Sequence, residues 1–182
     1  MNLPNILTLS RIFMIPLMVA CFYWPGETGK ILAAILFSIA AITDWFDGYL
    51  ARKLNQSTPL GAFLDPVADK LIVAVALVLL VEHYNTFWIS VPASIIICRE
   101  ILVSALREWM AELGKRANVA VSNIGKVKTT FQMISIIVLL GAGLHHWLVY
   151  LGYIAIYIAS VLTIWSMLLY LKAALPDLLA KE

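Results

Sequence analysis

Long apolar runs are the feature of this sequence that most restricts its fold. Each run is long enough for a helix rising ~1.5 Å per residue to cross a hydrocarbon core of about 30 Å. Hydrophobic residues make up 62% of the 182-residue chain, and its mean hydropathy is +0.90. A soluble domain of this size does not hold so much apolar side chain in its interior. We therefore predict an all-α integral membrane protein, with residues 1–182 forming a single domain.

Polar segments and glycine- or proline-containing breaks divide the apolar sequence into six predicted transmembrane helices. Trp24-Pro25-Gly26 is a turn signal after the first run, and Glu82 to Asn85 is predicted as another turn. Pro176 is expected to close the ordered part of the last helix. The predicted helices span approximately residues 5–23, 30–54, 60–81, 87–113, 124–140 and 147–172.

The positive charges favour one orientation of these helices in the membrane. All of the 13 Lys and Arg residues except Lys30 and Arg99 fall on the same side of a six-span bundle. Lys30 falls on the other side, and Arg99 lies within a span. Because Lys and Arg accumulate in cytoplasmic segments, we expect both termini to be cytoplasmic.

Four aspartates stand at the facing ends of the second and third predicted helices. Asp44 and Asp47 are three residues apart, and Asp65 and Asp69 are four apart, so each pair shares one helix face. Two helices joined by a short loop pack as antiparallel neighbours. The two carboxylate faces are therefore expected to meet.

Such a cluster requires positive charge, because each buried ion costs several kcal/mol to desolvate and like charges repel. Arg52 and Lys70, the cations nearest in sequence, are too few to balance it. Divalent ions such as Mg²⁺ or Mn²⁺ suit carboxylate ligands, and paired ions favour displacement at phosphorus. The simpler alternative places the four acids on the surface at helix ends; against it, acids within membrane segments are rare and usually functional.

The spacing of these residues resembles the signature of the CDP-alcohol phosphotransferase family. The signature requires four aspartates, two glycines, an alanine and an arginine at fixed gaps, and the chain supplies all of them. They are Asp44, Asp47, Gly48, Ala51, Arg52, Gly61, Asp65 and Asp69. Further segments, at residues 4–11, 99–108 and 125–129, resemble the bacterial members of the family that make phosphatidylglycerol phosphate, so the resemblance extends over the whole chain.

The resemblance implies roles for the four aspartates. Asp44, Asp47 and Asp65 would be metal ligands, and Asp69 would be both a ligand of a second ion and the general base. That base would take the proton of an acceptor alcohol, which attacks the β-phosphorus of CDP-diacylglycerol and releases CMP. The implied cofactors are two ions of Mg²⁺ or Mn²⁺.

The resemblance also implies a site for CDP-diacylglycerol. Small residues would admit the nucleotide, an arginine would bind phosphate, and residues of the opening segment and of the second loop would line the same site. These residues are Asn5, Thr8, Gly48, Ala51, Arg52, Thr58 and Gly61. For Asn5, a role as a helix cap or turn residue explains the sequence equally well.

A basic cluster follows in the fourth and fifth predicted helices. Arg99 and Arg107 are eight residues apart and share a helix face, and Lys126 opens the next helix. Arginine binds phosphate through two parallel hydrogen bonds, so we predict that these three residues bind the phosphate of glycerol 3-phosphate. The alternative is that basic residues here contact anionic lipid headgroups.

Other functions remain open at this level. The acceptor could be inositol phosphate, serine or phosphatidylglycerol; an intramembrane prenyltransferase and a cation transporter also place acids on membrane helices.

The favoured interpretation is a bacterial inner-membrane enzyme, multi-pass, with its active site toward the cytoplasm. Its expected partners are CDP-diacylglycerol, glycerol 3-phosphate and membrane lipid, with no nucleic acid. Small residues at Gly152, Ala155 and Ala159 suit helix packing and are compatible with a homodimer.

Overall fold

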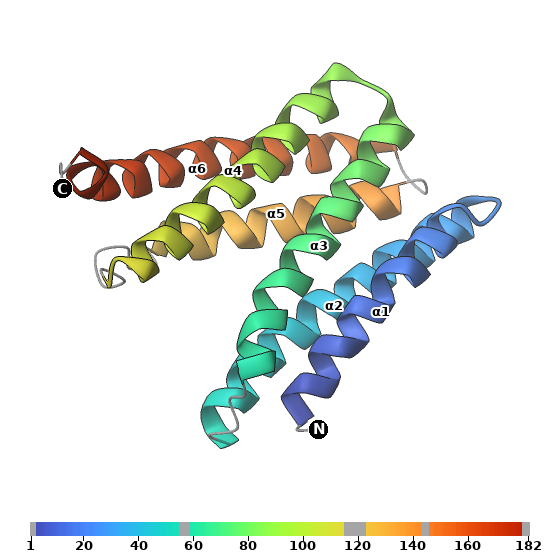
Figure 1. The fold of residues 1–182 in the computed structure, drawn as a ribbon. Coiled ribbons are helices and arrows are strands. Elements are labelled where there is room, and N and C mark those ends of the chain that lie inside the picture. Colours follow the sequence, from blue (N-terminus) through green and yellow to red (C-terminus); the bar gives the residue numbers. More distant parts are fainter. Residues whose placement is uncertain (1–2, 55–58, 115–122, 143–145, 180–182) are drawn as a thin grey trace.

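The computed structural model describes residues 3–54, 59–114, 123–142 and 146–179. Every regular element in these ranges is a helix, so the predicted all-α fold is confirmed (Figure 1). The helices are α1 (Leu3–Phe22), α2 (Glu27–Leu54), α3 (Pro59–Tyr84), α4 (Phe87–Glu112), α5 (Asn123–Gly141) and α6 (His146–Leu179).

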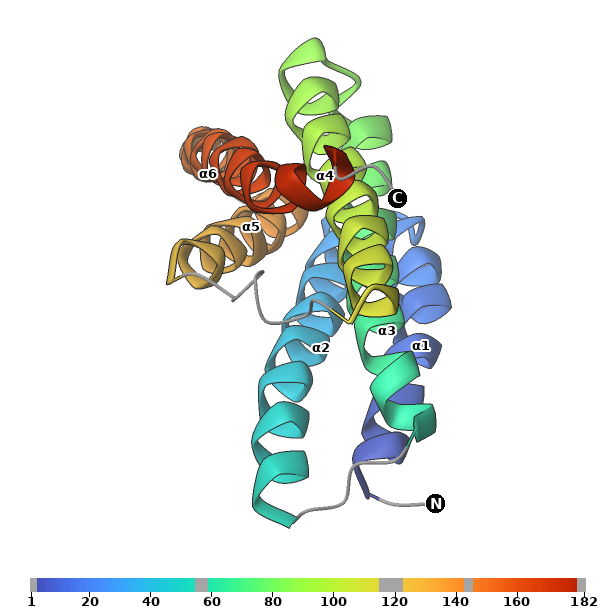
Figure 2. The same ribbon diagram turned by 60° about the vertical axis from the view of Figure 1, so that its left-hand side comes forward.

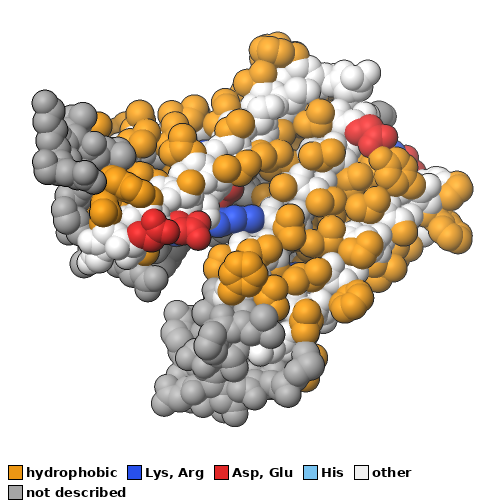
Figure 3. All heavy atoms as spheres, viewed as in Figure 1, with side chains coloured by type: hydrophobic (Ala, Val, Ile, Leu, Met, Phe, Trp, Pro, Cys, Tyr) orange, Lys and Arg blue, Asp and Glu red, His pale blue; other side chains and the backbone are white. Residues whose placement is uncertain are grey.

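Three stretches of the described chain have the length and hydropathy of a membrane span. They are Asn5–Phe22, Phe87–Glu112 and Trp147–Leu175, and Val127–Gly141 is apolar but shorter. Hydrophobic side chains cover most of the face formed by α1, α3 and α4, where charged side chains gather in small clusters (Figure 3). An exposed apolar surface of this extent is suited to lipid rather than water, as expected for a membrane protein.

The helices form two groups that meet around a shared core. Helix α1 packs against both α2 and α3, while α5 and α6 form a pair that contacts α4 through α6 and α2 through α5 (Figures 1 and 2). Alternating helix directions bring the starts of α1, α3 and α5 to the same side as the ends of α2, α4 and α6 (Figure 1). Phe37, Leu77, Ile96 and Ile136 are fully buried where the groups meet.

Two predicted helix ends were wrong. Helix α3 continues through Glu82 to Tyr84, and only Asn85 and Thr86 separate it from α4. Helix α6 continues past Pro176 to Leu179. A proline removes one backbone hydrogen bond from a helix, and the alanines and leucines around Pro176 have high helix propensity, so the helix persists beyond it.

Gly29 marks a close approach of α2 to the end of α1 and to the turn that joins the two helices. A Cβ atom on Gly29 would lie 2.5 Å from the carbonyl oxygen of Cys21 and 2.6 Å from that of Trp24. Both are backbone atoms, which cannot move aside as a flexible side chain does. We expect Gly29→Ala to destabilise the protein by roughly 1–3 kcal/mol, measured as a lower midpoint of thermal unfolding in detergent.

Gly141→Ala is the matched control for this substitution. A Cβ atom on Gly141 would meet the Cβ of Ala34 at 3.6 Å, an ordinary van der Waals contact. Its free energy of unfolding should stay within about 0.5 kcal/mol of that of the unsubstituted protein, so its thermal midpoint should hardly change. Equal midpoints for the two variants would contradict the close approach at Gly29.

Candidate active site

One face of α1 carries buried polar side chains on an otherwise apolar helix. Asn5, Thr8 and Arg11 follow one another at intervals of three residues, and all three are buried. Buried polar groups require partners, because an unsatisfied one costs free energy. The Thr8 hydroxyl donates a hydrogen bond to Oδ1 of Asp65, and Nη1 of Arg11 donates to Oδ1 of Asp69.

Arg11 joins two of the predicted metal ligands from different helices. Its Nη1 atom also lies 3.2 Å from Oδ1 of Asp44, so α1 provides one cation for a carboxylate of α2 and a carboxylate of α3. Asp44 and Asp69 interact with each other as well. Arg11 is only 1% exposed, whereas the side chains of Asp44 and Asp69 are 42% and 36% exposed. The carboxylates are therefore accessible from one side and held by a buried cation from the other.

The structure describes only part of the predicted aspartate and nucleotide site. Gly61 is buried near the start of α3, close in sequence to Asp65 and Asp69. The backbone of α2 includes four other predicted residues, but their side chains lie outside the described part of the chain, as does the whole of Thr58. Those four are Asp47, Gly48, Ala51 and Arg52.

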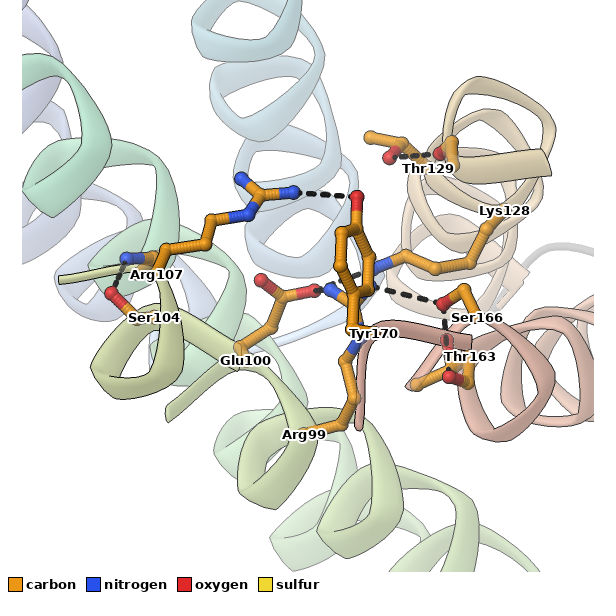
Figure 4. A network of polar contacts seen from close by, with 11 residues as sticks. Arg99, Glu100, Ser104, Arg107, Lys128, Thr129, Thr163, Ser166 and Tyr170 are labelled. Carbon is orange, nitrogen blue, oxygen red and sulfur yellow. Dashed lines mark hydrogen bonds and ion pairs between the residues drawn. The ribbon is translucent and has the colours of Figure 1, made fainter. Parts of the chain in front are cut away.

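A second polar cluster joins α4, α5 and α6. Arg99 is 7% exposed; its Nη1 lies 3.1 Å from Oε1 of Glu100, and its Nη2 donates to Oγ of Ser166 at 3.0 Å (Figure 4). The same Glu100 oxygen accepts a hydrogen bond from Nζ of buried Lys128. One carboxylate therefore neutralises part of the charge of two cations that come from different helices.

Arg107 is held above the same cluster by an aromatic ring. Its Nη2 donates to the Tyr170 hydroxyl at 2.8 Å, and its guanidinium lies 5.0 Å from the ring centroid (Figure 4). The guanidinium of Arg99 lies 5.8 Å from the same centroid. These are cation–π distances, so Tyr170 holds the two arginines on one side of the bundle. Lys126 opens α5, but its side chain is outside the described part.

The two clusters open onto one cavity of about 300 Å³. Asp44 and Asp69 line it from α2 and α3, while Arg99, Arg107 and Lys128 line it from α4 and α5. A cavity of this volume lies at the lower end of the range for small-molecule sites. Lys70 also lines it from α3 and Glu100 from α4. Asp44 and Asp69 on one side, with Arg99 and Arg107 on the other, can hold a metal ion and a phosphate group side by side.

The sequence matches a known family over most of its length. The model of the CDP-alcohol phosphatidyltransferase family matches residues 1–165. The chain belongs to this family. The resemblance drawn from the aspartate spacing is thereby confirmed.

Curated bacterial relatives are similar over nearly the whole chain. Proteins from Salmonella choleraesuis (strain SC-B67), Shigella flexneri serotype 5b (strain 8401) and Escherichia coli (strain K12) are each 57% identical over 178 residues. The matches cover 98% of this chain and 97% of each relative. All three are named CDP-diacylglycerol--glycerol-3-phosphate 3-phosphatidyltransferase.

Members of the CDP-alcohol phosphatidyltransferase family generally use divalent metal ions, and the donor set here is compatible with them. Asp44 and Asp69 offer oxygen ligands and already share one cation, the guanidinium of Arg11. Among the side chains that the structure describes, no three acidic, His or Cys groups gather closely enough to hold one ion. The side chain of Asp47 lies outside the described part of the chain.

Sequence reasoning missed several residues that the structure brings to the site of this family member. Arg11 was assigned only to the cytoplasmic positive charge, and Tyr170 was given no role. A buried pair of Arg99 with Glu100 was an alternative that the sequence offered, and the structure shows that pair. The available signal for Arg11 was a charged residue within an apolar run, three residues after Thr8 and six after Asn5. No signal in the sequence pointed to Tyr170, because its contact with Arg107 joins residues 63 apart.

Proposed function

We propose that this protein transfers the phosphatidyl group of CDP-diacylglycerol to sn-glycerol 3-phosphate, forming phosphatidylglycerol phosphate and CMP in phospholipid biosynthesis. The observation that carries this proposal is the single cavity lined by Asp44 and Asp69 at one wall and by Arg99 and Arg107 at the other. The names of relatives 57% identical over 98% of the chain support the same reaction.

The aspartate wall is proposed to be the metal centre. Asp44, Asp47, Asp65 and Asp69 would hold Mg²⁺ or Mn²⁺, with two ions expected. Bound divalent ions neutralise phosphate oxygens and stabilise the charge that develops on CMP as it leaves. The hydrogen bond from Thr8 to Asp65 fixes one carboxylate from the side of α1.

Asp69 is proposed to be the general base. It receives the proton of the acceptor hydroxyl as the alcohol oxygen forms a bond to the β-phosphorus, while the bond from that phosphorus to the CMP oxygen breaks. Asp69 is suited to this role because its carboxylate is partly exposed and lines the cavity, rather than being enclosed in the helix packing. Holding the alcohol beside the phosphorus contributes a further part of the rate, because the reacting groups are already oriented.

The cationic wall is proposed to bind the acceptor. Arg99 and Arg107 bind the phosphate of glycerol 3-phosphate, with Lys126 as a third ligand and Lys128 as a further cation of the wall. A phosphate dianion suits this wall because arginine donates two parallel hydrogen bonds to it. Glycerol 3-phosphate carries such a phosphate whereas serine does not, so the wall favours the former as acceptor.

The proposal also assigns residues to the CDP-diacylglycerol site and an orientation to the helices in the membrane. Asn5, Thr8, Gly61 and the α2 residues 48, 51 and 52, with Thr58, are proposed to bind CDP-diacylglycerol. All six helices are proposed to span the bacterial inner membrane, with both termini and the cavity on the cytoplasmic side, where soluble glycerol 3-phosphate is available.

The reaction is tested by measuring CMP release from CDP-diacylglycerol by the purified protein in detergent. With Mg²⁺ or Mn²⁺ present, release with glycerol 3-phosphate should exceed release with serine by at least about tenfold, since serine lacks the phosphate and loss of a charged hydrogen bond costs roughly 1.5–3 kcal/mol. Release should depend on the added metal. Equal release with serine would contradict the assigned acceptor, and metal flux into liposomes without CMP release would favour transport.

A further inference from the structure

The buried guanidinium of Arg11 has no role in the transfer reaction as proposed, yet it contacts two carboxylates of the aspartate wall. Arg11 is the largest of the fully buried side chains in the described structure, at 1% exposure. Arginine stays protonated in proteins, so its burial places a permanent positive charge inside the helix bundle. A buried charge of this kind requires an opposite charge beside it.

The opposite charges come from two other helices. Nη1 of Arg11 contacts Oδ1 of Asp69 and lies 3.2 Å from Oδ1 of Asp44. A single nitrogen therefore links α1 to both α2 and α3, where two carboxylates of like charge would otherwise repel each other. The shared cation reduces this repulsion and holds the two acids at the cavity wall.

The same two carboxylates are among the groups that would hold a metal ion. Oxygens of Asp44 and Asp69 suit hard divalent ions, and each Oδ1 is already directed at the guanidinium. A divalent ion bound between these carboxylates would also lie a few ångströms from a fixed positive charge, which opposes its binding. Arg11 and the metal therefore compete for the two carboxylates.

We propose that Arg11 is the resident counter-cation of the aspartate wall: it holds Asp44 and Asp69 together when no divalent ion is bound, and it lowers the affinity of the wall for that ion by competing for the same carboxylates. This inference rests on the metal centre of the proposed function. Arg11 is thus a positioning residue. It keeps the helices assembled at low metal concentration and keeps the metal exchangeable.

The competition is tested by measuring Mn²⁺ binding directly, through the electron paramagnetic resonance signal of free Mn²⁺ titrated with detergent-purified protein. Arg11→Met removes the charge and keeps most of the side-chain length. It should bind Mn²⁺ at least about tenfold more tightly than the unsubstituted protein. Arg11→Lys retains the charge and should stay within about threefold of the unsubstituted protein. In EDTA, Arg11→Met should unfold at a lower temperature, and Mn²⁺ should raise that temperature more than in the unsubstituted protein.

Lys30→Met is the matched control, because it removes the same charge near the start of α2, where Lys30 pairs only weakly with Glu27 at 3.9 Å. Its Mn²⁺ affinity should not change. If Arg11→Met does not fold, Arg11→Gln replaces it with the same expectation, since the amide still donates hydrogen bonds to the carboxylates.

Unchanged or weaker Mn²⁺ binding by the charge-removed variant would overturn the role of Arg11 while leaving the metal centre intact. A lack of Mn²⁺ binding by both proteins would overturn the metal centre and this inference together. Asp44→Asn and Asp69→Asn separate these cases, because each should weaken Mn²⁺ binding if the wall is the metal centre.

Discussion

Asp69→Asn should lower the rate of CMP release by about a thousandfold, within the 10²–10⁴ range that general acid–base catalysis contributes. Asparagine has nearly the same shape as aspartate but cannot accept a proton at neutral pH. It is also a poorer ligand for a divalent ion than a carboxylate. The proposed base and part of the metal centre are therefore lost together, while the volume of the cavity is retained.

The measurement is the initial rate of CMP release at saturating CDP-diacylglycerol and glycerol 3-phosphate. Because Asp69 also pairs with Arg11, the thermal unfolding of the variant in detergent must be measured alongside. Glu27→Gln makes the same chemical change at the start of α2, on a side chain that is 51% exposed and does not line the cavity, and should leave the rate unchanged. A folded Asp69→Asn protein that retains normal turnover would exclude Asp69 as the base.

Arg107→Ala should raise the KM for glycerol 3-phosphate by about 10- to 100-fold, because a charge-assisted hydrogen bond contributes roughly 1.5–3 kcal/mol. Arg107 lines the cavity and is oriented by Tyr170, so its loss removes a positioned cation rather than a mobile one. The KM for CDP-diacylglycerol should change little, since that substrate is assigned to α1, α2 and the start of α3.

The control for Arg107 is Lys172→Ala. Lys172 is an exposed cation on α6, two residues after Tyr170, and is not among the residues that line the cavity. Its removal changes the net charge equally and tests whether general attraction of the dianion explains the effect. An equal rise of KM in both variants, or none in Arg107→Ala, would remove Arg107 from the acceptor site.

The helical architecture follows closely from the sequence. Six apolar runs predicted six helices, and the described helices occur in the same order with ends that differ by a few residues. This was predictable because membrane helices satisfy their backbone hydrogen bonds locally, so apolar length alone defines them. The ends of α3 and α6 were wrong because Glu82 and Pro176 are helix-ending signals that the helices override.

The family and the reaction class were also determined by sequence alone. The spacing of Asp44, Asp47, Asp65 and Asp69 fixes two helix faces without any knowledge of how the helices pack. The intervals of three and four residues are local properties of a helix. They do not specify which other residues complete the site.

Only the tertiary structure showed which side chains contact the predicted site residues. Arg11 contacts Asp69 across 58 residues of sequence, and Tyr170 contacts Arg107 across 63. Neither contact follows from a helical period, because each depends on which helices pack together and on the rotation of each about its axis. The sequence therefore determined the helices and the acids, and the packing of α1 against α2 and α3 determined the cation that holds those acids in place.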